Sequence, residues 1–293
     1  AQIIPRPPQI NATAYILMDA ATGTVLVESN ADVPQPPASL TKIMTALVVL
    51  RRTSPGDIVR VDRAAIFGPG DFGASATLGL RAGERITVRN LLFALLLGSA
   101  NDAAEALAIH VAGSIDAFVE LMDARAEALG MRSTSFASPH GLDDRGRSTA
   151  EDLVLLLRAA HADPRFSAIV ATRLHTIAAP QGRPRRIQNR NAMLWLYPGA
   201  VGTKTGLTAG AGPCLAVVAE RDGRRLIAIV LDADGEAFSP AAALLNHGFD
   251  GFIETAVVRA GEPVGSVDLV GGSVPVVAGR DLVALVATDL ADR

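Results

Sequence analysis

Apolar residues recur with the period of a strand in two parts of the chain. Early in the sequence, residues 13–20 (TAYILMDA) and 24–29 (TVLVES) are separated by the turn segment ATG, which predicts a β-hairpin. Later, residues 214–220 (CLAVVAE) and 225–233 (RLIAIVLDA) flank Asp222-Gly223, a dipeptide that favours tight hairpin turns. The pattern therefore predicts two hairpins that are far apart in the sequence.

Between these hairpins the apolar spacing is that of helices. Residues 39–52 (SLTKIMTALVVLRR) place apolar side chains on one face of a predicted helix: Leu40, Ile43, Met44, Leu47 and Val48. Further helices are predicted in the ranges 86–98, 101–113, 114–130, 148–161 and 239–249. Ser114 and Gly130 suit the start and the stop of one helix. Ser148 and Glu151 have the spacing of a capping box in another.

The order of these elements indicates the fold class. Strands, then many helices, then strands and a last helix are typical of an α/β (α+β) protein. We expect an antiparallel sheet whose edges come from both ends of this part of the chain, with the helices inserted between them. From about Thr255 the sequence changes to short β segments broken by glycine and proline. We therefore expect a main domain over 1–254 and a short or truncated β-rich segment over 255–293.

Composition narrows the class of protein. The 293 residues are 49% hydrophobic and 19% charged, which provides apolar material for a sizeable core. The net charge is −3 and the arginines are scattered among acids, so nothing indicates a nucleic-acid partner. The longest apolar run, residues 91–97, is too short to cross a bilayer. A single cysteine, Cys214, and histidines without His-x₃-His spacing predict neither a disulfide nor a metal, and we expect no cofactor.

Lysine is rare in this chain, and its positions point to chemistry. Of the 27 basic residues, all but Lys42 and Lys204 are arginine. Arginine does not lose its proton in proteins, whereas burial and nearby positive charge can leave a lysine neutral and able to act as a base. Ser39 precedes Lys42 by three residues, so the two side chains share one side of the predicted helix. Ser39 is then either a helix cap or a nucleophile whose proton Lys42 accepts.

Lys204 lies in the segment 201–208 (VGTKTGLT), whose glycines invite comparison with a phosphate-binding loop. The comparison fails because Thr203, and not glycine, precedes Lys204 and no strand–loop–helix unit surrounds it. A strand is predicted instead, so that Lys204-Thr205-Gly206 lines a cleft along a strand edge. The ammonium and hydroxyl groups would meet a carboxylate, and Gly206 would let a ligand approach the backbone.

A third motif, Ser99-Ala100-Asn101, falls between two predicted helices. Alone it is equally a helix cap, with Asn101 starting the next helix. In chain order, however, Ser-x-x-Lys, Ser-x-Asn and Lys-Thr-Gly form the signature of penicillin-binding proteins and class A β-lactamases. The chain resembles the low-molecular-mass D-alanyl-D-alanine carboxypeptidases, peptidase family S11. Residues 136–153 (FASPHGLDDRGRSTAEDL) and 189–208 (NRNAMLWLYPGAVGTKTGLT) are similar to further segments of that family.

This resemblance implies a β-lactamase/transpeptidase-like fold and a serine carboxypeptidase that trims the terminal D-alanine from peptidoglycan pentapeptides, with β-lactam antibiotics as inhibitors. For catalysis it implies the nucleophile Ser39, the base Lys42 and the proton relay Ser99. For substrate binding it implies Asn101 at the amide, Gly206 in the cleft, and Lys204, Thr205 and Arg190 at the terminal carboxylate. The oxyanion hole would be formed by Leu207 with Ser39. The resemblance also implies an exported protein, in the bacterial periplasm or on the outer face of the cytoplasmic membrane. Membrane association is expected only through a C-terminal anchor, which we do not find in these residues.

Two alternatives remain open. A class A β-lactamase of the same fold would carry a Glu-x-x-Leu-Asn segment between Asn101 and Lys204, and the sequence has none there. Its middle motif would also be Ser-Asp-Asn, whereas this chain has Ser-Ala-Asn. A penicillin-binding sensor or scaffold would carry the same three motifs and would be acylated without turnover. Release of free D-alanine from a pentapeptide analogue distinguishes an enzyme from such a receptor.

Overall fold

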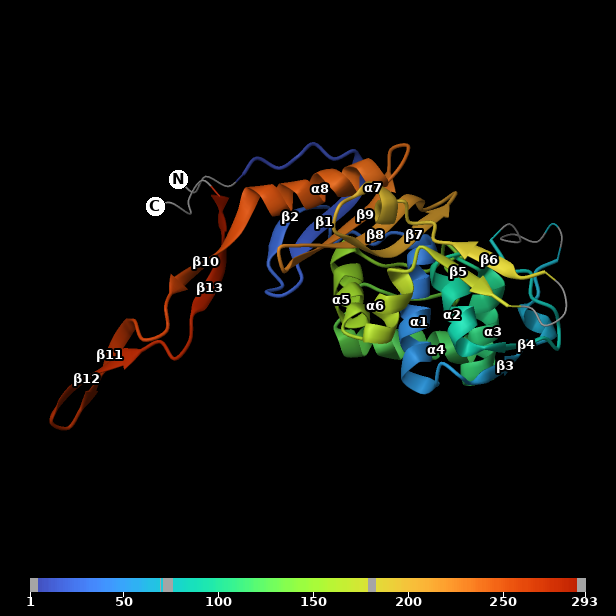
Figure 1. Cartoon of the computed structure of the whole chain (residues 1–293), viewed down its shortest axis with the longest axis horizontal. Helices are drawn as coiled ribbons and strands as arrows, with labels where there is room; N and C mark the ends of the chain where they lie inside the picture. The colour runs from blue at the N-terminus through green and yellow to red at the C-terminus, as the bar shows by residue number, and fades with distance from the viewer. Residues whose placement is uncertain (1–4, 69, 71–75, 179–182, 289–293) are drawn as a thin grey trace. The chain divides into compact units, whose positions relative to one another are not determined.

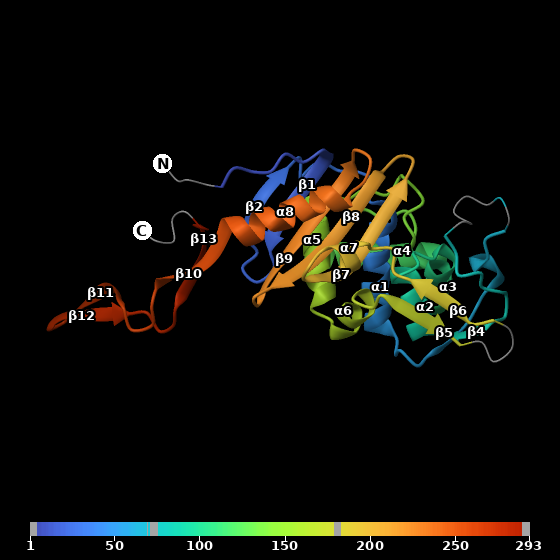
Figure 2. The ribbon, with the colours of Figure 1, turned by 45° about the horizontal axis from the view of Figure 1, so that its top comes forward.

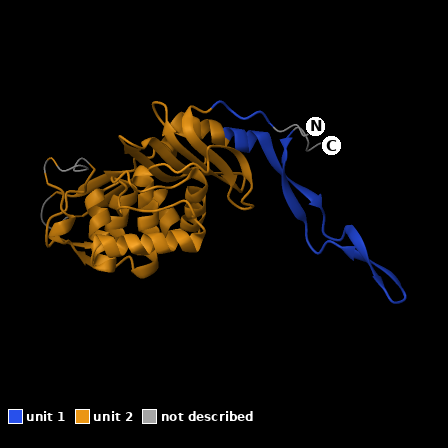
Figure 3. Cartoon of the chain, turned by 180° about the vertical axis from the view of Figure 1, so that it is seen from behind, with its two compact units in different colours: residues 1–9, 246–293 blue, residues 10–245 orange. Residues whose placement is uncertain are grey.

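The computed structural model describes residues 5–68, 70, 76–178 and 183–288 (Figure 1). Contacts between residues divide the chain into two compact units (Figure 3). The larger covers residues 10–245 (orange, labelled unit 2 in the figure) and is called the first unit in the text; the smaller covers residues 1–9 and 246–293 (blue, labelled unit 1) and is called the second unit. All three sequence motifs fall within the first unit. No helix in the described ranges is long and apolar enough to span a membrane.

The first unit contains a five-stranded antiparallel sheet with the strand order β2-β1-β9-β8-β7. Its strands are β1 (Ala12–Asp19), β2 (Val25–Ser29), β7 (Ala200–Thr208), β8 (Gly212–Arg221) and β9 (Arg224–Ala233). Both predicted hairpins are confirmed, since β1 pairs with β2 and β8 pairs with β9. Between β8 and β9, Asp222 and Gly223 have φ of 51° and 77°, the positive values that a type I′ hairpin turn requires. Because β1 pairs with β9, one sheet joins segments from both ends of this unit, as expected.

Helices lie on both faces of this sheet and beside it. In the first unit they are η1 (Ala38–Leu40), α1 (Thr41–Arg52), η2 (Arg63–Ala65), α2 (Val88–Leu96), α3 (Asn101–Ala112), α4 (Ile115–Leu129), α5 (Ala150–His161), α6 (Pro164–Val170) and α7 (Met193–Leu196). Two short hairpins accompany them: β3 (Ile58–Arg60) with β4 (Arg85–Thr87), and β5 (Leu174–Ile177) with β6 (Arg185–Gln188). Helix α5 packs against β1 and β9, and the first part of α8 (Phe238–Gly251), up to Leu245, covers the opposite face of the sheet (Figure 2).

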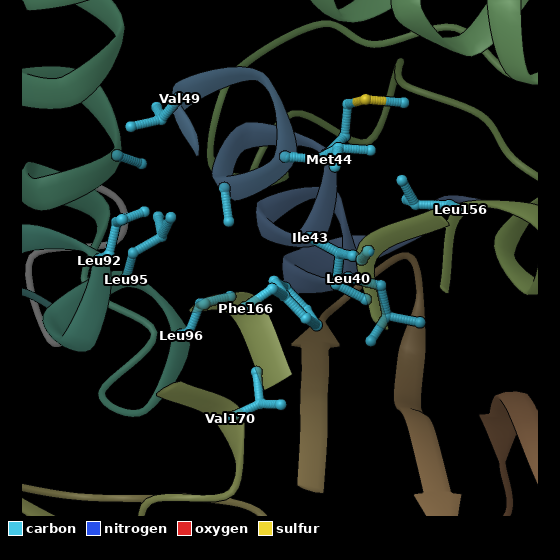
Figure 4. Packing of buried hydrophobic residues seen from close by; sticks show 14 of the residues in the cluster. Leu40, Ile43, Met44, Val49, Leu92, Leu95, Leu96, Leu156, Phe166 and Val170 are labelled. Atoms are coloured by element: carbon cyan, nitrogen blue, oxygen red, sulfur yellow. The ribbon is translucent and has the colours of Figure 1, made fainter. Parts of the chain in front are cut away.

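Helix α1 is the centre of the helical core. Every residue from Thr41 to Leu50 is buried, because α2, α3, α4, α5 and α6 all contact this helix. Figure 4 shows apolar side chains of α1, α2, α5 and α6 meeting in this core. The sequence predicted a single apolar face, whereas α1 is buried on all sides, as helices at the middle of a domain are. Its polar residues, Lys42 among them, must therefore find partners inside the protein.

Some of the predicted helix ends are confirmed and others differ from the structure. Helix α4 does begin after Ser114, whose hydroxyl accepts a hydrogen bond from a backbone N–H, and it stops at Gly130 as predicted. The capping box at Ser148 is wrong, because the neighbouring Thr149 caps α5 and accepts a hydrogen bond from the Asp152 N–H at 3.1 Å. Helix α2 ends at Leu96, before Gly98, where the prediction ended it. Helix α3 begins at Asn101, as predicted; its cap residue is Ala100, and the Asn101 Oδ1 accepts a hydrogen bond from Lys42 Nζ.

The second unit is rich in strands. They are β10 (Phe252–Val258), β11 (Pro263–Leu269), β12 (Gly272–Val277) and β13 (Leu282–Ala287). Strand β10 pairs with β13, and β11 pairs with β12, both antiparallel. The β segments expected after Thr255 are therefore present, and the domain boundary placed after residue 254 stays a prediction.

Candidate active site

Ser39 lies in a tight turn directly before the central helix. The turn, η1, contains Ala38 with φ of 47°, a left-handed conformation that is strained for a residue with a side chain. Gly141 lies against this turn, and a Cβ atom on it would collide with the Ala38 carbonyl and with Thr41 Oγ1. Ser39 does not cap α1, whose cap residue is Leu40, so the helix-cap interpretation of Ser39 is wrong. The close packing instead fixes where its hydroxyl points.

Lys42 lies below Ser39 and is completely buried. Its Nζ is 2.9 Å from Ser39 Oγ, 2.9 Å from Asn101 Oδ1 and 2.7 Å from the His140 carbonyl oxygen. The amide and carbonyl oxygens can only accept hydrogen bonds, whereas a serine hydroxyl can also donate. A neutral amine has two N–H groups and one lone pair, so it can donate to both oxygens and accept the Ser39 proton.

The electrostatic surroundings favour the neutral amine. Burial lowers the pKa of Lys42 well below the usual lysine value, and the nearby charges of Lys204 and Arg190 lower it further. Among the residues that the structure describes, no carboxylate bonds to this amine, and its partners are Ser39, Asn101 and the His140 carbonyl. The geometry and the charge distribution therefore agree that Lys42 can serve as a base towards Ser39.

Lys204 is the second buried lysine of the site, with 1% of its surface exposed. Its Nζ donates to Ser99 Oγ at 3.0 Å and to the Thr205 carbonyl at 2.7 Å. Burial, and then the charge of Arg190, lower the pKa of Lys204 to about 7. The described hydrogen bonds link Ser99 to Lys204 and not to Lys42, so one half of the expected proton relay is formed in this structure.

A pocket of about 500 Å³ opens above these lysines. Of the predicted site residues it is lined by Ser39, Ser99, Asn101, Arg190, Thr205, Gly206 and Leu207. Lys42 and Lys204 lie buried beneath it and bond to its lining serines. The structure thus brings all nine predicted site residues to one place. The pocket follows β7, which is an edge strand of the sheet, as the sequence predicted for the Lys-Thr-Gly motif.

Gly206 has a packing role that the sequence did not indicate. The approach of a ligand to its backbone stays a prediction, and Gly206 does line the pocket. A Cβ atom on Gly206 would lie 3.1 Å from Ala38 Cβ and 3.3 Å from Cys214 Cβ. The glycine therefore lets β7 pack closely against the turn that carries Ser39. Cys214 is buried in β8, as expected for a free cysteine.

Two structural contributions to the site have no signal in the sequence. The first is the His140 carbonyl that binds Lys42, because any residue type can supply a backbone oxygen. The His140 side chain supports its own loop: its Nδ1 accepts a hydrogen bond from the Leu142 N–H at 3.1 Å, and its Nε2 lies 3.2 Å from Glu105 Oε1. Residues 136–153 resemble a segment of the family, but this resemblance does not indicate which atom of the segment reaches Lys42.

The second is the loop over residues 76–80, which contributes to one wall of the pocket. Its Ala76 lines the pocket, and its carbonyl accepts a hydrogen bond from the Asn101 N–H at 2.7 Å. The buried Asp102 carboxylate accepts hydrogen bonds from the backbone N–H groups of Leu78, Gly79, Leu80 and Ala103, at 2.8 to 3.0 Å. Asp102 therefore holds the loop against the start of α3. In the described ranges no group of three or more His, Cys, Asp or Glu side chains is placed to hold a metal ion.

Comparisons with known proteins identify the family of this chain. A family model described as D-alanyl-D-alanine carboxypeptidase (Peptidase_S11) matches residues 1–235. The D-alanyl-D-alanine carboxypeptidase DacD of Escherichia coli is 40% identical over 273 residues, which cover 89% of this chain and 69% of that protein. The D-alanyl-D-alanine carboxypeptidase DacB2 of Mycobacterium tuberculosis is 38% identical over 251 residues, which cover 83% of this chain and 84% of the relative.

Solved structures share the fold. Penicillin-binding protein 6B from Escherichia coli superposes with a TM-score of 0.83 and 34% identity, over 98% of this chain and 88% of that one. A variant of the Streptomyces K15 DD-transpeptidase superposes with a TM-score of 0.76 and 31% identity, over 83% of this chain and 99% of that one. These matches confirm the predicted β-lactamase/transpeptidase-like fold. The chain belongs to the D-alanyl-D-alanine carboxypeptidase family, peptidase family S11.

Proposed function

We propose that this protein is a serine D-Ala-D-Ala carboxypeptidase that removes the terminal D-alanine from peptidoglycan pentapeptides through an acyl-enzyme on Ser39. One observation carries the assignment of the nucleophile: the buried Lys42 Nζ lies 2.9 Å from Ser39 Oγ, and burial lowers the pKa of this lysine. A serine hydroxyl is a weak nucleophile until a base accepts its proton. A positioned base typically accelerates such a step by about 10²–10⁴-fold.

The acylation step uses the hydrogen bonds of Lys42. The Ser39 proton passes to the lone pair of neutral Lys42 as Ser39 Oγ attacks the carbonyl carbon of the D-Ala–D-Ala bond. The resulting ammonium keeps its hydrogen bonds to Asn101 Oδ1 and to the His140 carbonyl. The developing oxyanion is bound by the backbone N–H groups of Ser39 and Leu207, and losing one such donor costs about 10²–10³ in rate.

Strand β7 supplies the binding site for the substrate. An edge strand has a row of backbone N–H and C=O groups without a strand partner, and an extended peptide can pair with them. Lys204 and Thr205 then hold the terminal carboxylate, with Arg190 beside them. Gly206 shapes this cleft, and Asn101 hydrogen-bonds the substrate amide.

Ser99 serves the departing amine. Its hydroxyl accepts a hydrogen bond from Lys204, which leaves the Ser99 proton available to the leaving nitrogen of D-alanine. The proton lost from Ser99 is replaced from the lysines, and water then hydrolyses the ester on Ser39. A β-lactam acylates Ser39 in the same way, but its leaving group stays attached, so the adduct persists and the enzyme is inhibited.

The experiment is a pair of measurements on the same preparation. Free D-alanine released from a pentapeptide analogue is measured over many turnovers, and intact-mass and peptide mapping locate the adduct formed by labelled penicillin. We expect turnover and an adduct on Ser39. The variant Ser39→Ala should abolish both, whereas Ser54→Ala, at an exposed serine outside the pocket, should change neither. An adduct on Ser99 would contradict the assignment.

The same measurements address the other two functions. Acylation of Ser39 without release of D-alanine would indicate the sensor or scaffold. A β-lactamase needs a carboxylate that activates the deacylating water. Among the described residues that line the pocket, the one carboxylate is Glu236, and it accepts a hydrogen bond from the Ser239 N–H at 3.0 Å at the start of α8. Because this hydrogen bond already occupies the Glu236 carboxylate, the site favours the carboxypeptidase over the β-lactamase.

The location and the partners follow from this substrate. We propose that the protein acts in the periplasm or at the outer face of the cytoplasmic membrane, where peptidoglycan peptides are exposed. Its partners would be the D-Ala-D-Ala peptides and, as inhibitors, the β-lactams.

A further inference from the structure

A row of two arginine-lined cavities continues from the Ser39 pocket. One, of about 400 Å³, adjoins the pocket because Arg190 lines both. Arg185 in turn lines this cavity and a larger one of about 1010 Å³. Neither Ser39 nor the two buried lysines line them, so they lie outside the catalytic machinery. We call these two cavities together the arginine groove.

The arginine groove differs in charge from the protein as a whole. Its described lining residues include six arginines, which are Arg81, Arg85, Arg183, Arg185, Arg186 and Arg190. They include one acidic residue, Glu84. The whole chain has a net charge of −3, so the groove concentrates positive charge against the overall balance. A cleft lined by one sign of charge raises the local concentration of ligands of the opposite sign.

Arg185 has a structural role in the groove, and the other five arginines line its open space. Arg185 forms two hydrogen bonds with the Glu84 carboxylate and donates to the Gly79 carbonyl at 3.1 Å. This pair offsets the single negative charge and ties β6 to the loop held by Asp102. The other five guanidinium groups make no hydrogen bond or ion pair with a described residue. They are therefore available to an anion.

The spacing along β6 suits an extended ligand. Arg186, Gln188 and Arg190 are exposed, whereas Ile187 and Asn189 between them are buried, as expected for one open face of a strand. An extended backbone rises about 3.3 Å per residue, so the stretch 183–190 spans at most about 23 Å. The two cavities, of about 400 and about 1010 Å³, together offer more room than a single D-Ala-D-Ala terminus fills.

We propose that the arginine groove binds a second, carboxylate-bearing peptide of the same peptidoglycan strand, beside the peptide being cut. This rests on the proposed function, in which the substrate ends at the carboxylate held by Lys204, Thr205 and Arg190. Nothing of the cut peptide extends beyond that carboxylate, so the groove on the other side of Arg190 takes a different chain. Guanidinium groups match carboxylates with two parallel hydrogen bonds, which favours an acidic peptide.

The test compares two substrates on a groove variant. One is a short peptide ending in D-Ala-D-Ala whose terminal carboxylate is its only charge, and the other is soluble uncrosslinked peptidoglycan. In the groove variant, Arg81, Arg85, Arg183 and Arg186 are replaced by Gln, while the structural Arg185 and the site residue Arg190 are kept. Exposed ion pairs are individually weak, so we expect kcat/KM for the polymer to fall about tenfold with four lost. Activity on the short peptide should stay at the wild-type value.

A control variant distinguishes the loss of the groove arginines from a general change in net charge. It replaces Arg51, Arg52, Arg63 and Arg132 by Gln, which are exposed and line none of these cavities. We expect wild-type kinetics on both substrates. An equal loss in the groove and control variants on the polymer, or no loss in the groove variant, would overturn the proposal. Absence of D-alanine release from both substrates by the wild-type protein would instead refute the proposed function.

Competition identifies the anion. An oligoglutamate peptide should inhibit cleavage of the polymer by the wild-type protein and lose this effect on the groove variant. Inorganic polyphosphate of equal charge provides the comparison, because guanidinium groups also bind phosphate. Stronger inhibition by polyphosphate that is likewise lost in the groove variant would overturn the carboxylate assignment in favour of a phosphate-bearing polymer.

Discussion

Replacing Lys204 by Met should make the protein more stable in acid while it abolishes activity. Lys204 is buried, and its pKa is lowered to about 7 by burial first and then by Arg190. In the unfolded chain the same side chain has a pKa of about 10.4. The folded protein therefore loses the Lys204 proton at a much lower pH than the unfolded chain does. Below pH 7 it must keep the charged ammonium buried. Met has a similar length and no charge to bury.

The magnitude follows from the two pKa values. One pKa unit corresponds to about 1.4 kcal/mol, so below pH 7 the buried ammonium lowers the free energy of unfolding by about 5 kcal/mol. The variant also loses two hydrogen bonds, to Ser99 and to the Thr205 carbonyl, worth about 1 kcal/mol each. We expect Lys204→Met to be more stable than the wild type by about 3 kcal/mol at pH 6.

The difference should depend on pH in a defined direction. Between the folded and unfolded pKa values the unfolded chain binds more protons, so the wild-type free energy of unfolding rises with pH. From pH 6 to pH 9 this rise is about 2.5 kcal/mol, and the variant lacks this contribution. The advantage of Lys204→Met should therefore nearly disappear by pH 9. Groups whose pKa does not depend on Lys204 cancel in the comparison, whereas removal of the Lys204 charge also raises the pKa of Lys42, which again favours the variant in acid.

Urea unfolding at several pH values measures this difference. Trp195, the chain's one tryptophan, lies in the unit that contains the site, so its fluorescence reports that unit. Lys204→Arg is the matched control, because it keeps a cation that cannot deprotonate and should stay destabilised at every pH. A stability difference between wild type and Lys204→Met that is the same at pH 6 and pH 9 would refute the lowered pKa.

Three further predictions concern Ser39 and its surroundings. Lys42→Arg keeps the charge and removes the base, so acylation of Ser39 by labelled penicillin should fall at least about 100-fold by mass spectrometry; a wild-type rate would identify another base. The second-order acylation rate of the wild type should rise with pH, with an apparent pKa well below that of free lysine. This pKa belongs to the coupled pair Lys42 and Lys204. A rise centred at about pH 10.4 would contradict a neutral Lys42. Gly141→Ala places a Cβ atom against the Ala38 carbonyl and should destabilise the protein by about 2–4 kcal/mol in urea unfolding and slow acylation, whereas unchanged stability would show that the turn can move.

The fold was predictable where local patterns decide it. The two hairpins follow from strand periodicity and a two-residue turn, and the helix between Ser114 and Gly130 follows from its capping residues. The burial of α1 on all sides was not predictable, because helices that surround it come from distant parts of the sequence. The cap of α5 moved by one residue because Ser148 and Thr149 are adjacent hydroxyl residues, and Ser148 bonds to Thr134 Oγ1 at 2.8 Å.

The site was predictable where side-chain chemistry is specific. Three short motifs, each with a serine or a lysine at fixed spacing, identified the candidate residues, and the structure places these residues at one pocket. The His140 carbonyl and the loop held by Asp102 left no such signal, because backbone groups complete both arrangements. The arginine groove was hidden for another reason. The arginines of segments 81–85 and 183–190 are about a hundred residues apart in the sequence and become neighbours only in the folded chain, where Arg185 bonds to Glu84 and to the Gly79 carbonyl.

The two buried lysines also determine how the protein responds to chemical modification. Neither lysine amine is on the described surface, since Lys42 is 0% exposed and Lys204 is 1% exposed. Amine-directed labels and cross-linkers therefore meet no surface lysine side chain, and immobilisation through lysine would require reaction inside the pocket. A neutral amine reacts with such reagents and an ammonium does not, so any lysine modification of the folded protein would report access to the Ser39 pocket, and a bound β-lactam should block it.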